Sequence, residues 1–217
     1  MLQKKIATVL GLCAVSGVAM ADLSANIGIS SDYFVRGTTQ TNHGAAVSGG
    51  LDYSNASGSY AGTWISNIAA GTEIDLYAGY AGDMGSIGYD VGIIHYGYPI
   101  TSGDIDAQEI YISGSWEFVN ASLNINTDSD AGMYAAVGLS HDMAGLSWNL
   151  HNGTSLGAKK ADGSDADSVT DTKLSAAKTI GDWDWGMNFS INSAVKNEKT
   201  DSIILQPSIS LSRSFDL

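Results

Sequence analysis

The stretch that decides the fold is Glu109-Ile110-Tyr111-Ile112-Ser113-Gly114-Ser115-Trp116-Glu117-Phe118. Every second residue from Ile110 to Phe118 is apolar or glycine, and the residues between them are polar apart from Tyr111. Successive side chains of a β-strand point to opposite faces, so this alternation gives a strand one apolar and one polar face. Similar blocks of roughly ten residues recur up to the last residue, without a helical pattern between them. The sequence therefore predicts an all-β chain.

Breaks in the alternation divide the chain into about twelve predicted strands, with ten or fourteen as alternatives. Their approximate spans are 23–36, 45–54, 59–68, 73–81, 86–98, 108–118, 121–127, 132–141, 146–152, 172–180, 183–192 and 202–217. The even-numbered connections are tight and rich in Asn, Asp and Gly, which accept the positive φ angles of hairpin turns. The odd-numbered connections are mostly longer, with 69–72 as the short exception. A soluble β-sandwich would also alternate, but outer-membrane barrels are the class that sorts its connections in this way. We therefore expect a closed antiparallel transmembrane β-barrel.

The first twenty-one residues have the pattern of a secretory signal peptide. Lys4 and Lys5 precede a short apolar run over 6–18, and Ala19-Met20-Ala21 supplies small residues for cleavage. The run is too short to span a bilayer as a helix. Cys13 raises the alternative of a lipoprotein, but Leu12 stands where a lipoprotein signal needs a small residue. We expect cleavage near Ala21, with residues 1–21 as signal peptide and 22–217 as one barrel domain.

The charge balance is strongly acidic. The chain has 10 Lys and Arg residues against 23 Asp and Glu residues, and its formal net charge is −13 at pH 7. Such a chain repels polyanions, so nucleic acid is not an expected partner. Cleavage would remove Cys13, the only cysteine, so the mature chain is expected to use no disulfide.

The last predicted strand carries an apolar stripe that reaches the terminus. Its members are Leu205, Pro207, Ile209, Leu211, Arg213, Phe215 and Leu217. A final strand with an apolar alternation that ends in a large hydrophobe resembles the signal by which the barrel-assembly machinery recognises outer-membrane proteins. Aromatic residues near strand ends could form two girdles at the headgroup level, or could reflect β-propensity alone: Tyr33, Tyr53, Tyr60, Trp64, Tyr98, Trp116 and Trp183.

Three short motifs are more distinctive than the periodicity. The first is Ser31-Asp32-Tyr33-Phe34-Val35-Arg36-Gly37, and it is followed by Gly49-Gly50-Leu51-Asp52-Tyr53 and by Gly62-Thr63-Trp64-Ile65-Ser66-Asn67. Over roughly residues 28–82 the chain resembles the TorF family of outer-membrane porins, formerly catalogued as proteobacterial proteins of unknown function. The resemblance implies an outer-membrane β-barrel with a porin-like function, and it supplies no catalytic residues.

If the apolar face meets lipid, the polar face lines the interior. By phase, the candidate lumen-lining residues are Asp32, Arg36, Asp52, Glu73, Asp75, Asp90, Glu109 and Glu117. Seven acids against one base predict a water-filled lumen that favours cations. The alternative is a plugged interior in which Arg36 pairs with neighbouring acids for structural reasons. Small barrels are filled by side chains and large ones enclose a channel, and twelve strands lie between the two.

The sequence predicts no cofactor, metal centre or enzymatic activity. The four histidines, His43, His95, His141 and His151, have no metal-ligand spacing. The acidic loop with Asp162, Asp165, Asp167 and Asp171 does not follow the ligand order of a calcium-binding EF-hand. A weak calcium site there remains an alternative. A serine–histidine pair of a membrane-embedded hydrolase cannot be recognised from sequence positions, because such pairs form only in space.

The predicted function is therefore that of a porin-like barrel in the bacterial outer membrane. We expect passive passage of small polar solutes or ions, with cations favoured. The alternatives are a non-conducting structural or adhesive barrel and a lipid hydrolase embedded in the membrane. The expected partners are outer-membrane lipid, the barrel-assembly machinery and small polar solutes.

Overall fold

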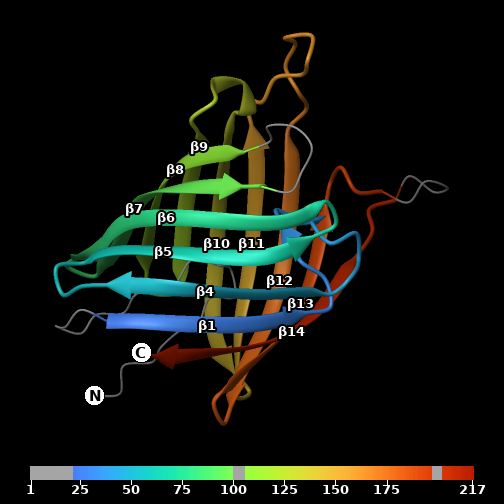
Figure 1. Ribbon diagram of the computed structural model, residues 1–217. Coiled ribbons are helices and arrows are strands. Elements are labelled where there is room, and N and C mark those ends of the chain that lie inside the picture. The colour runs from blue at the N-terminus through green and yellow to red at the C-terminus, as the bar shows by residue number, and fades with distance from the viewer. Residues whose placement is uncertain (1–21, 100–105, 197–201) are drawn as a thin grey trace.

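A computed structural model describes residues 22–99, 106–196 and 202–217. Twelve long strands form one closed antiparallel barrel in the order β1-β14-β13-β12-β11-β10-β9-β8-β7-β6-β5-β4 (Figure 1). Their bounds are β1 Asp22–Ser30, β4 Ala46–Ser54, β5 Ser59–Ile68, β6 Gly71–Met84, β7 Ile87–Gly97, β8 Ala107–Trp116, β9 Val119–Asn126, β10 Met133–Met143, β11 Leu146–Leu156, β12 Val169–Ile180, β13 Trp183–Asn192 and β14 Gln206–Asp216. The short strands β2 (Phe34–Val35) and β3 (Thr38–Thr39) pair with each other only, and a 3-10 turn covers Ser129–Ala131.

The connections alternate in length as predicted. The tight ones are 55–58, 85–86, 117–118, 144–145 and 181–182, and the longer ones are 31–45, 98–106, 127–132, 157–168 and 193–205, with 69–70 as the short exception. Both ends of the barrel wall lie with the tight turns, where the Leu217 N–H donates to the Leu23 carbonyl at 2.9 Å. The prediction of a twelve-stranded antiparallel barrel is confirmed. In the three described stretches, no helix is both long and apolar enough to span a membrane. The predicted signal peptide, with Cys13, lies outside these residues.

The two faces of the barrel wall have opposite chemistry. On β8, Ile110 and Ile112 are exposed on the outside, whereas Glu109 and Tyr111 are 5% and 3% exposed on the inside. The strand register carries this division around the barrel, because directly paired residues lie on the same face. A soluble domain would bury its isoleucines, so an apolar exterior around a polar interior suits a lipid surrounding.

Buried tyrosines cluster on the inner face of the wall formed by β5 to β8. Tyr60, Tyr77 and Tyr111 are buried in one cluster with Ile94. Each of the three rings covers a glycine on the next strand, and the pairs are Tyr60–Gly79, Tyr77–Gly62 and Tyr111–Gly92. A Cβ on any of these glycines would lie 2.3–2.5 Å from the nearest atom of the tyrosine that covers it. The glycines therefore give the tyrosines room to lie against the wall. For Tyr60 and Trp64 the structure does not support the girdle alternative, because their register puts both inside the barrel.

The predicted first strand, 23–36, was too long. The β1 strand ends at Ser30, and residues 31–45 leave the wall and turn into the barrel. Ser31 marks the departure: its N–H donates to the Ile209 carbonyl and its hydroxyl accepts from the Ile209 N–H. The alternation continues beyond this point because β2 is itself a strand, although it runs in another direction. We call residues 31–45 the inserted hairpin.

Candidate functional site

The tip of the inserted hairpin is a two-residue turn. Val35 pairs with Thr38 across it, and the two turn residues Arg36 and Gly37 have φ angles of +48° and +71°. Two positive φ angles define a type I′ turn, which favours Asn-Gly. An arginine there costs about 1–2 kcal/mol of backbone strain, so surrounding contacts must hold it.

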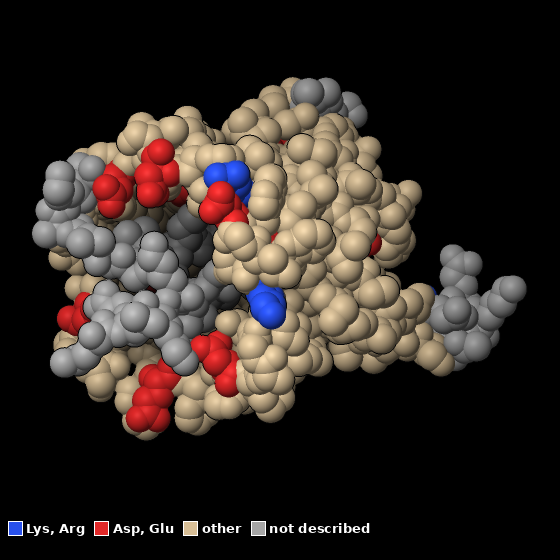
Figure 2. All heavy atoms as spheres, turned by 90° about the horizontal axis from the view of Figure 1, so that it is seen from below, with Lys and Arg blue, Asp and Glu red and all other residues tan. Residues whose placement is uncertain are grey.

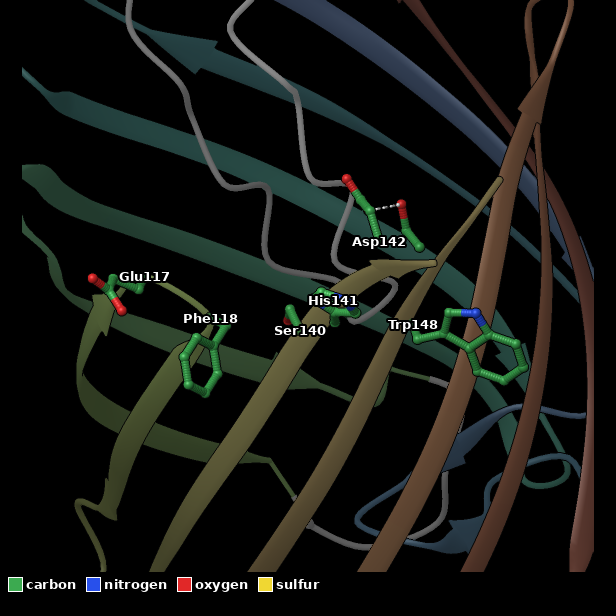
Figure 3. Close-up of a pocket in the computed structure, with 7 residues that line it drawn as sticks. Glu117, Phe118, Ser140, His141, Asp142 and Trp148 are labelled. Atoms are coloured by element: carbon green, nitrogen blue, oxygen red, sulfur yellow. Dashed lines mark hydrogen bonds between the residues drawn. The ribbon is translucent and has the colours of Figure 1, made fainter. Parts of the chain in front are cut away.

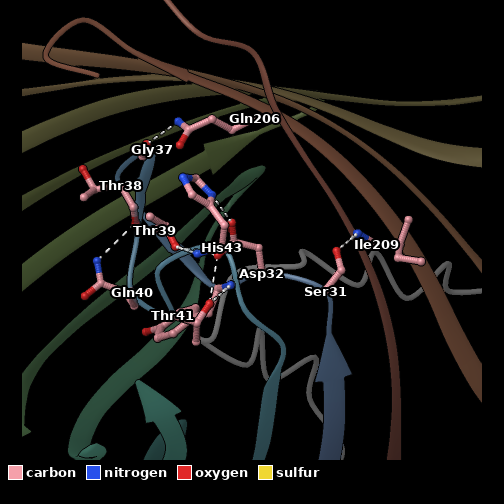
Figure 4. A network of polar contacts seen from close by, with 11 residues as sticks. Ser31, Asp32, Gly37, Thr38, Thr39, Gln40, Thr41, His43, Gln206 and Ile209 are labelled. Carbon is pink, nitrogen blue, oxygen red and sulfur yellow. Dashed lines mark hydrogen bonds and ion pairs between the residues drawn. The ribbon is translucent and has the colours of Figure 1, made fainter. Parts of the chain in front are cut away.

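Those contacts come from β12, β13 and β14, on one side of the interior. The Asn192 amide donates to the Arg36 carbonyl at 2.8 Å. The Gln206 amide donates to the Gly37 carbonyl at 2.9 Å (Figure 4). A Cβ on Gly37 would approach those of Asn192 and Asp171 to 2.9 Å. The tip is therefore pressed against the inner wall, with room for glycine only.

The Arg36 side chain reaches a different part of the wall. Its Nη2 lies 2.8 and 2.7 Å from the two carboxylate oxygens of Glu109 on β8. The guanidinium also lies over the Tyr134 ring of β10, 4.3 Å from its centroid. The Asn124 amide donates to the same Glu109 carboxylate at 3.2 Å. The Arg36–Glu109 ion pair is thus supported by the Tyr134 ring, which contacts the guanidinium, and by the uncharged Asn124 amide, which donates to the carboxylate.

Asp32 organises the base of the hairpin and does not line open space. Its carboxylate accepts from the hydroxyls of Thr39 and Thr41 at 2.6 and 2.9 Å, and His43 Nδ1 lies 2.8 Å from its second oxygen (Figure 4). The side chain is 6% exposed. Asp32 therefore closes the hairpin on itself.

Tyr33 fastens the hairpin to the β5–β6 wall. Its hydroxyl donates to Glu73 Oε1 at 2.7 Å, and its ring packs on Trp64 with centroids 5.2 Å apart. Burial and the Glu73 carboxylate raise the pKa of Tyr33 far above its ordinary value, so the hydroxyl keeps its proton as a donor. The hairpin is thus held on several sides.

Five of the eight predicted lumen-lining residues lie on the inner face of the wall: Asp52, Glu73, Asp75, Asp90 and Glu109. Asp52 accepts from the amide of Asn26 at 3.0 Å and from the Tyr77 hydroxyl, and Asp90 accepts from the Tyr60 hydroxyl at 2.6 Å. Asp32 and Arg36 reach the interior from the hairpin instead of from the wall.

Glu117 was wrongly placed on a strand face. It lies in the turn 117–118 with φ +52°, and its side chain is exposed. The alternation of residues 109–118 runs straight into this turn, so the pattern alone does not show where β8 ends.

The inner-facing charges that the prediction missed include Asp171 and Lys173. Asp171 was assigned to the acidic loop, yet it is the third residue of β12, 3% exposed, and accepts from the Tyr134 hydroxyl at 2.7 Å. His151 pairs with the same hydroxyl at 2.8 Å. Lys173 follows Asp171 on the inner face, opposite His151. The alternation of Asp171, Lys173 and Ser175 was the signal that could have revealed them.

The interior differs along its length. At the level of the hairpin the inner side chains are buried, as for Glu73, Ser190 and Asn192, which are 1%, 1% and 2% exposed. Nearer the tight turns the inner side chains are partly exposed, as for Asn26 and Asn188. Several acidic side chains lie on the face of the molecule that is seen from below (Figure 2). The hairpin therefore narrows the interior toward the outer-loop end, and the inner side chains are more exposed toward the tight turns.

A separate pocket of about 250 Å³ lies between the turns 117–118 and 144–145 (Figure 3). Ser140 and His141 both line it, but as neighbours on β10 they point to opposite faces. The Ser147 hydroxyl donates to Asp142 at 2.8 Å, so this carboxylate is occupied by a local contact.

Several other polar groups considered from sequence have local partners. His95 lies 3.4 Å from the Gln108 amide. In the loop 157–168, Asp162 accepts from Ser164 and Asp165 pairs with Lys159. Over the described residues, no three or more His, Cys, Asp or Glu side chains are grouped to hold a metal ion.

The barrel is similar to solved porin structures. The KdgM porin superposes with a TM-score of 0.60 at 9% identity, covering 88% of this chain and 99% of that one. A structure of the KdgM porin in complex with disordered oligogalacturonate gives 0.57 at 8% identity, with coverages of 89% and 99%. The NanC porin gives 0.53 at 11% identity, with coverages of 90% and 100%. These likenesses show that the chain has the fold of a porin-like barrel.

Sequence comparison gives the family. No curated protein sequence matches the chain. A family described as "Bacterial protein of unknown function (Gcw_chp)" matches residues 14–202, which is most of the chain. The chain therefore belongs to the Gcw_chp family of bacterial proteins.

Proposed function

We propose that this protein is a porin-like barrel of the bacterial outer membrane that passes small polar solutes or ions passively and favours cations. The observation that carries the proposal is the excess of acids inside a barrel whose outside is apolar. The described acids that face or enter the interior include Asp32, Asp52, Glu73, Asp75, Asp90, Glu109 and Asp171, against the bases Arg36 and Lys173. Charges of one sign in a confined lumen add their fields and raise the local concentration of counter-ions.

The preferred solute differs from the one named for a similar porin. Oligogalacturonate, present with the KdgM porin, is a chain of carboxylated sugars and hence a polyanion. An acidic interior repels polyanions. The shared fold therefore supports the architecture, and the charge of this interior supports a cationic or neutral solute.

The inserted hairpin favours a second candidate, a barrel that does not conduct. The hairpin is fixed on several walls, and the inner side chains at its level are buried. A lumen closed at this level would leave the outer loops as the functional surface. A lipid hydrolase has less support. Three histidines have partners other than serine, and the pairs are His43–Asp32, His95–Gln108 and His151–Tyr134.

Planar-bilayer recording of the purified, refolded protein separates the two candidates. A channel should give discrete conductance steps, with reversal potentials that show cation preference in a salt gradient. Anion preference would overturn the electrostatic part of the proposal. The absence of steps in any salt would favour the non-conducting barrel.

We further propose that residues 1–21 are removed on export, and that the last strand is read by the barrel-assembly machinery. The resemblance to TorF porins supports the same location. N-terminal sequencing of protein from outer-membrane fractions should find Asp22 first. A mature chain that begins with a modified Cys13 would contradict this.

A further inference from the structure

Two carboxylates lie side by side on the inner face of β6. Glu73 and Asp75 are separated by one residue, so they point to the same side of the strand, and they are 1% and 6% exposed. In the register, Asp75 lies directly between Trp64 of β5 and Tyr96 of β7. Tyr33 of the inserted hairpin packs on the edge of this group through Trp64. The site is thus an acidic pair with aromatic neighbours, at the level where the hairpin narrows the interior.

The hydrogen bonds of this pair are incomplete. Glu73 is hydrogen bonded by the side chains of Tyr33 and Tyr98, but Asp75 Oδ1 is buried and has no partner. Within the described stretches, no nitrogen of Lys, Arg or His lies within 4.0 Å of either carboxylate, and the nearby Arg36 is engaged by Glu109. An isolated carboxylate loses several kcal/mol when it leaves water without compensation. The pair therefore lacks a positively charged hydrogen-bond donor.

The Arg36–Glu109 pair shows how a positively charged donor is bound in this interior. There, the Arg36 guanidinium donates to Glu109 and covers the Tyr134 ring at 4.3 Å. A nitrogen cation is thus held between a carboxylate and an aromatic side chain. Asp75 has the same two kinds of neighbour, a carboxylate and aromatic rings, without the cation.

We propose that Glu73 and Asp75 bind the primary ammonium group of a small organic cation. This inference rests on the proposed cation-favouring channel and names the class of solute that its narrow level selects. An ammonium group brings three N–H donors, which suffice for Asp75 Oδ1 and for an oxygen of Glu73. The rings of Trp64 and Tyr96 suit the attached carbon atoms and the charge. Calcium is a poorer fit, since it takes six to eight oxygen ligands and two carboxylates supply few of them.

Isothermal titration calorimetry of the detergent-solubilised protein tests the site directly. The probes are methylammonium chloride and potassium chloride at equal ionic strength, with the parent, Asp75→Asn, Glu73→Gln and the control Asp167→Asn. Asp167 is an exposed acid of the loop 157–168, so its substitution makes the same chemical change away from the site. We expect the parent and the control to bind methylammonium, and Asp75→Asn to bind it about tenfold or more weakly, the usual effect of losing a hydrogen bond to a charged group.

Three other results of the titration would overturn the inference. Absence of methylammonium binding to the parent removes the site. Equal binding of potassium and methylammonium shows a site for charge alone, and equal weakening by Asp167→Asn shows a general field effect. Heat-modifiability on gels shows whether the Asp75→Asn variant folds. If it does not fold, methylammonium binding is compared between the parent and the Glu73→Gln variant. Bilayer recording keeps the function separate: conductance without methylammonium binding overturns the site alone, and binding without conductance overturns the channel alone.

Discussion

Arg36 Nη2 lies 2.8 and 2.7 Å from the two carboxylate oxygens of Glu109, although 73 residues separate the two in the chain. The contact joins the tip of the inserted hairpin to β8, while the backbone of the same tip is bound by Asn192 of β13. The hairpin is therefore fixed across the interior, and the narrowing of the lumen depends on this pair.

We expect Arg36→Ala to destabilise the hairpin and to raise conductance. Glu109 is 5% exposed, and the loss of its charged partner should lower the free energy of unfolding by about 1–3 kcal/mol. Denaturant unfolding in detergent measures the stability, and single-channel recording measures the conductance.

The double variant Arg36→Ala/Glu109→Gln is the control for charge. It removes both partners, so it should unfold at a higher denaturant concentration than Arg36→Ala alone while keeping a raised conductance. Equal stability of the single and double variants would mean that the pair does not hold the hairpin.

Gly37→Ala should loosen the tip of the hairpin more than backbone strain alone explains. The added methyl would lie 2.9 Å from the Cβ atoms of Asn192 and Asp171. The matched control is Gly85→Ala, at φ +67° in a tight turn with nothing within 4 Å. Both variants lose about 1–2 kcal/mol to the positive φ angle. Only Gly37→Ala should also increase single-channel conductance, and an equal change in Gly85→Ala would contradict this.

Gly62→Ala should displace the Tyr77 ring and weaken the bond from its hydroxyl to Asp52. The new methyl would lie 2.5 Å from the ring, and overpacking of this kind costs about 1–3 kcal/mol. At Gly114, the nearest atom to an added methyl is 3.7 Å away, so Gly114→Ala should unfold like the parent. Heat-modifiability on gels compares the two, and equal unfolding temperatures would show that the ring does not need the glycine.

Asp90→Asn should reduce cation preference, whereas Glu117→Gln should leave it unchanged. Asp90 lies inside the barrel and is bound by the Tyr60 hydroxyl, while Glu117 is exposed in a turn. Reversal potentials in a salt gradient measure the preference. The difference should shrink toward 1 M salt, where the screening length falls to about 3 Å. A larger effect of Glu117→Gln would place the selective field at the tight-turn rim.

The barrel could be predicted because its determinants are local and periodic. The alternation of Ile110, Ile112 and Trp116 with polar residues is a property of a strand whose faces meet lipid and interior, whichever strand lies beside it. Tight turns carry their own signature in Asn, Asp and Gly. The order of the barrel strands then follows, because each strand pairs with the next one along the chain, and the barrel closes when the last strand pairs with the first.

The site depended on tertiary structure, because its contacts join residues far apart in the chain. Residues 31–37 alternate like a strand of the barrel wall. Only their contacts with Asn192, Gln206 and Glu109 show that they turn into the interior. The alternation also cannot separate Glu117, beyond the end of β8, from Glu109 within it. It likewise gives no sign that Arg36 neutralises Glu109 and leaves Asp75 without a donor. Local sequence therefore determined which face each wall residue takes, and the packing of distant strands around one hairpin decided which charges meet.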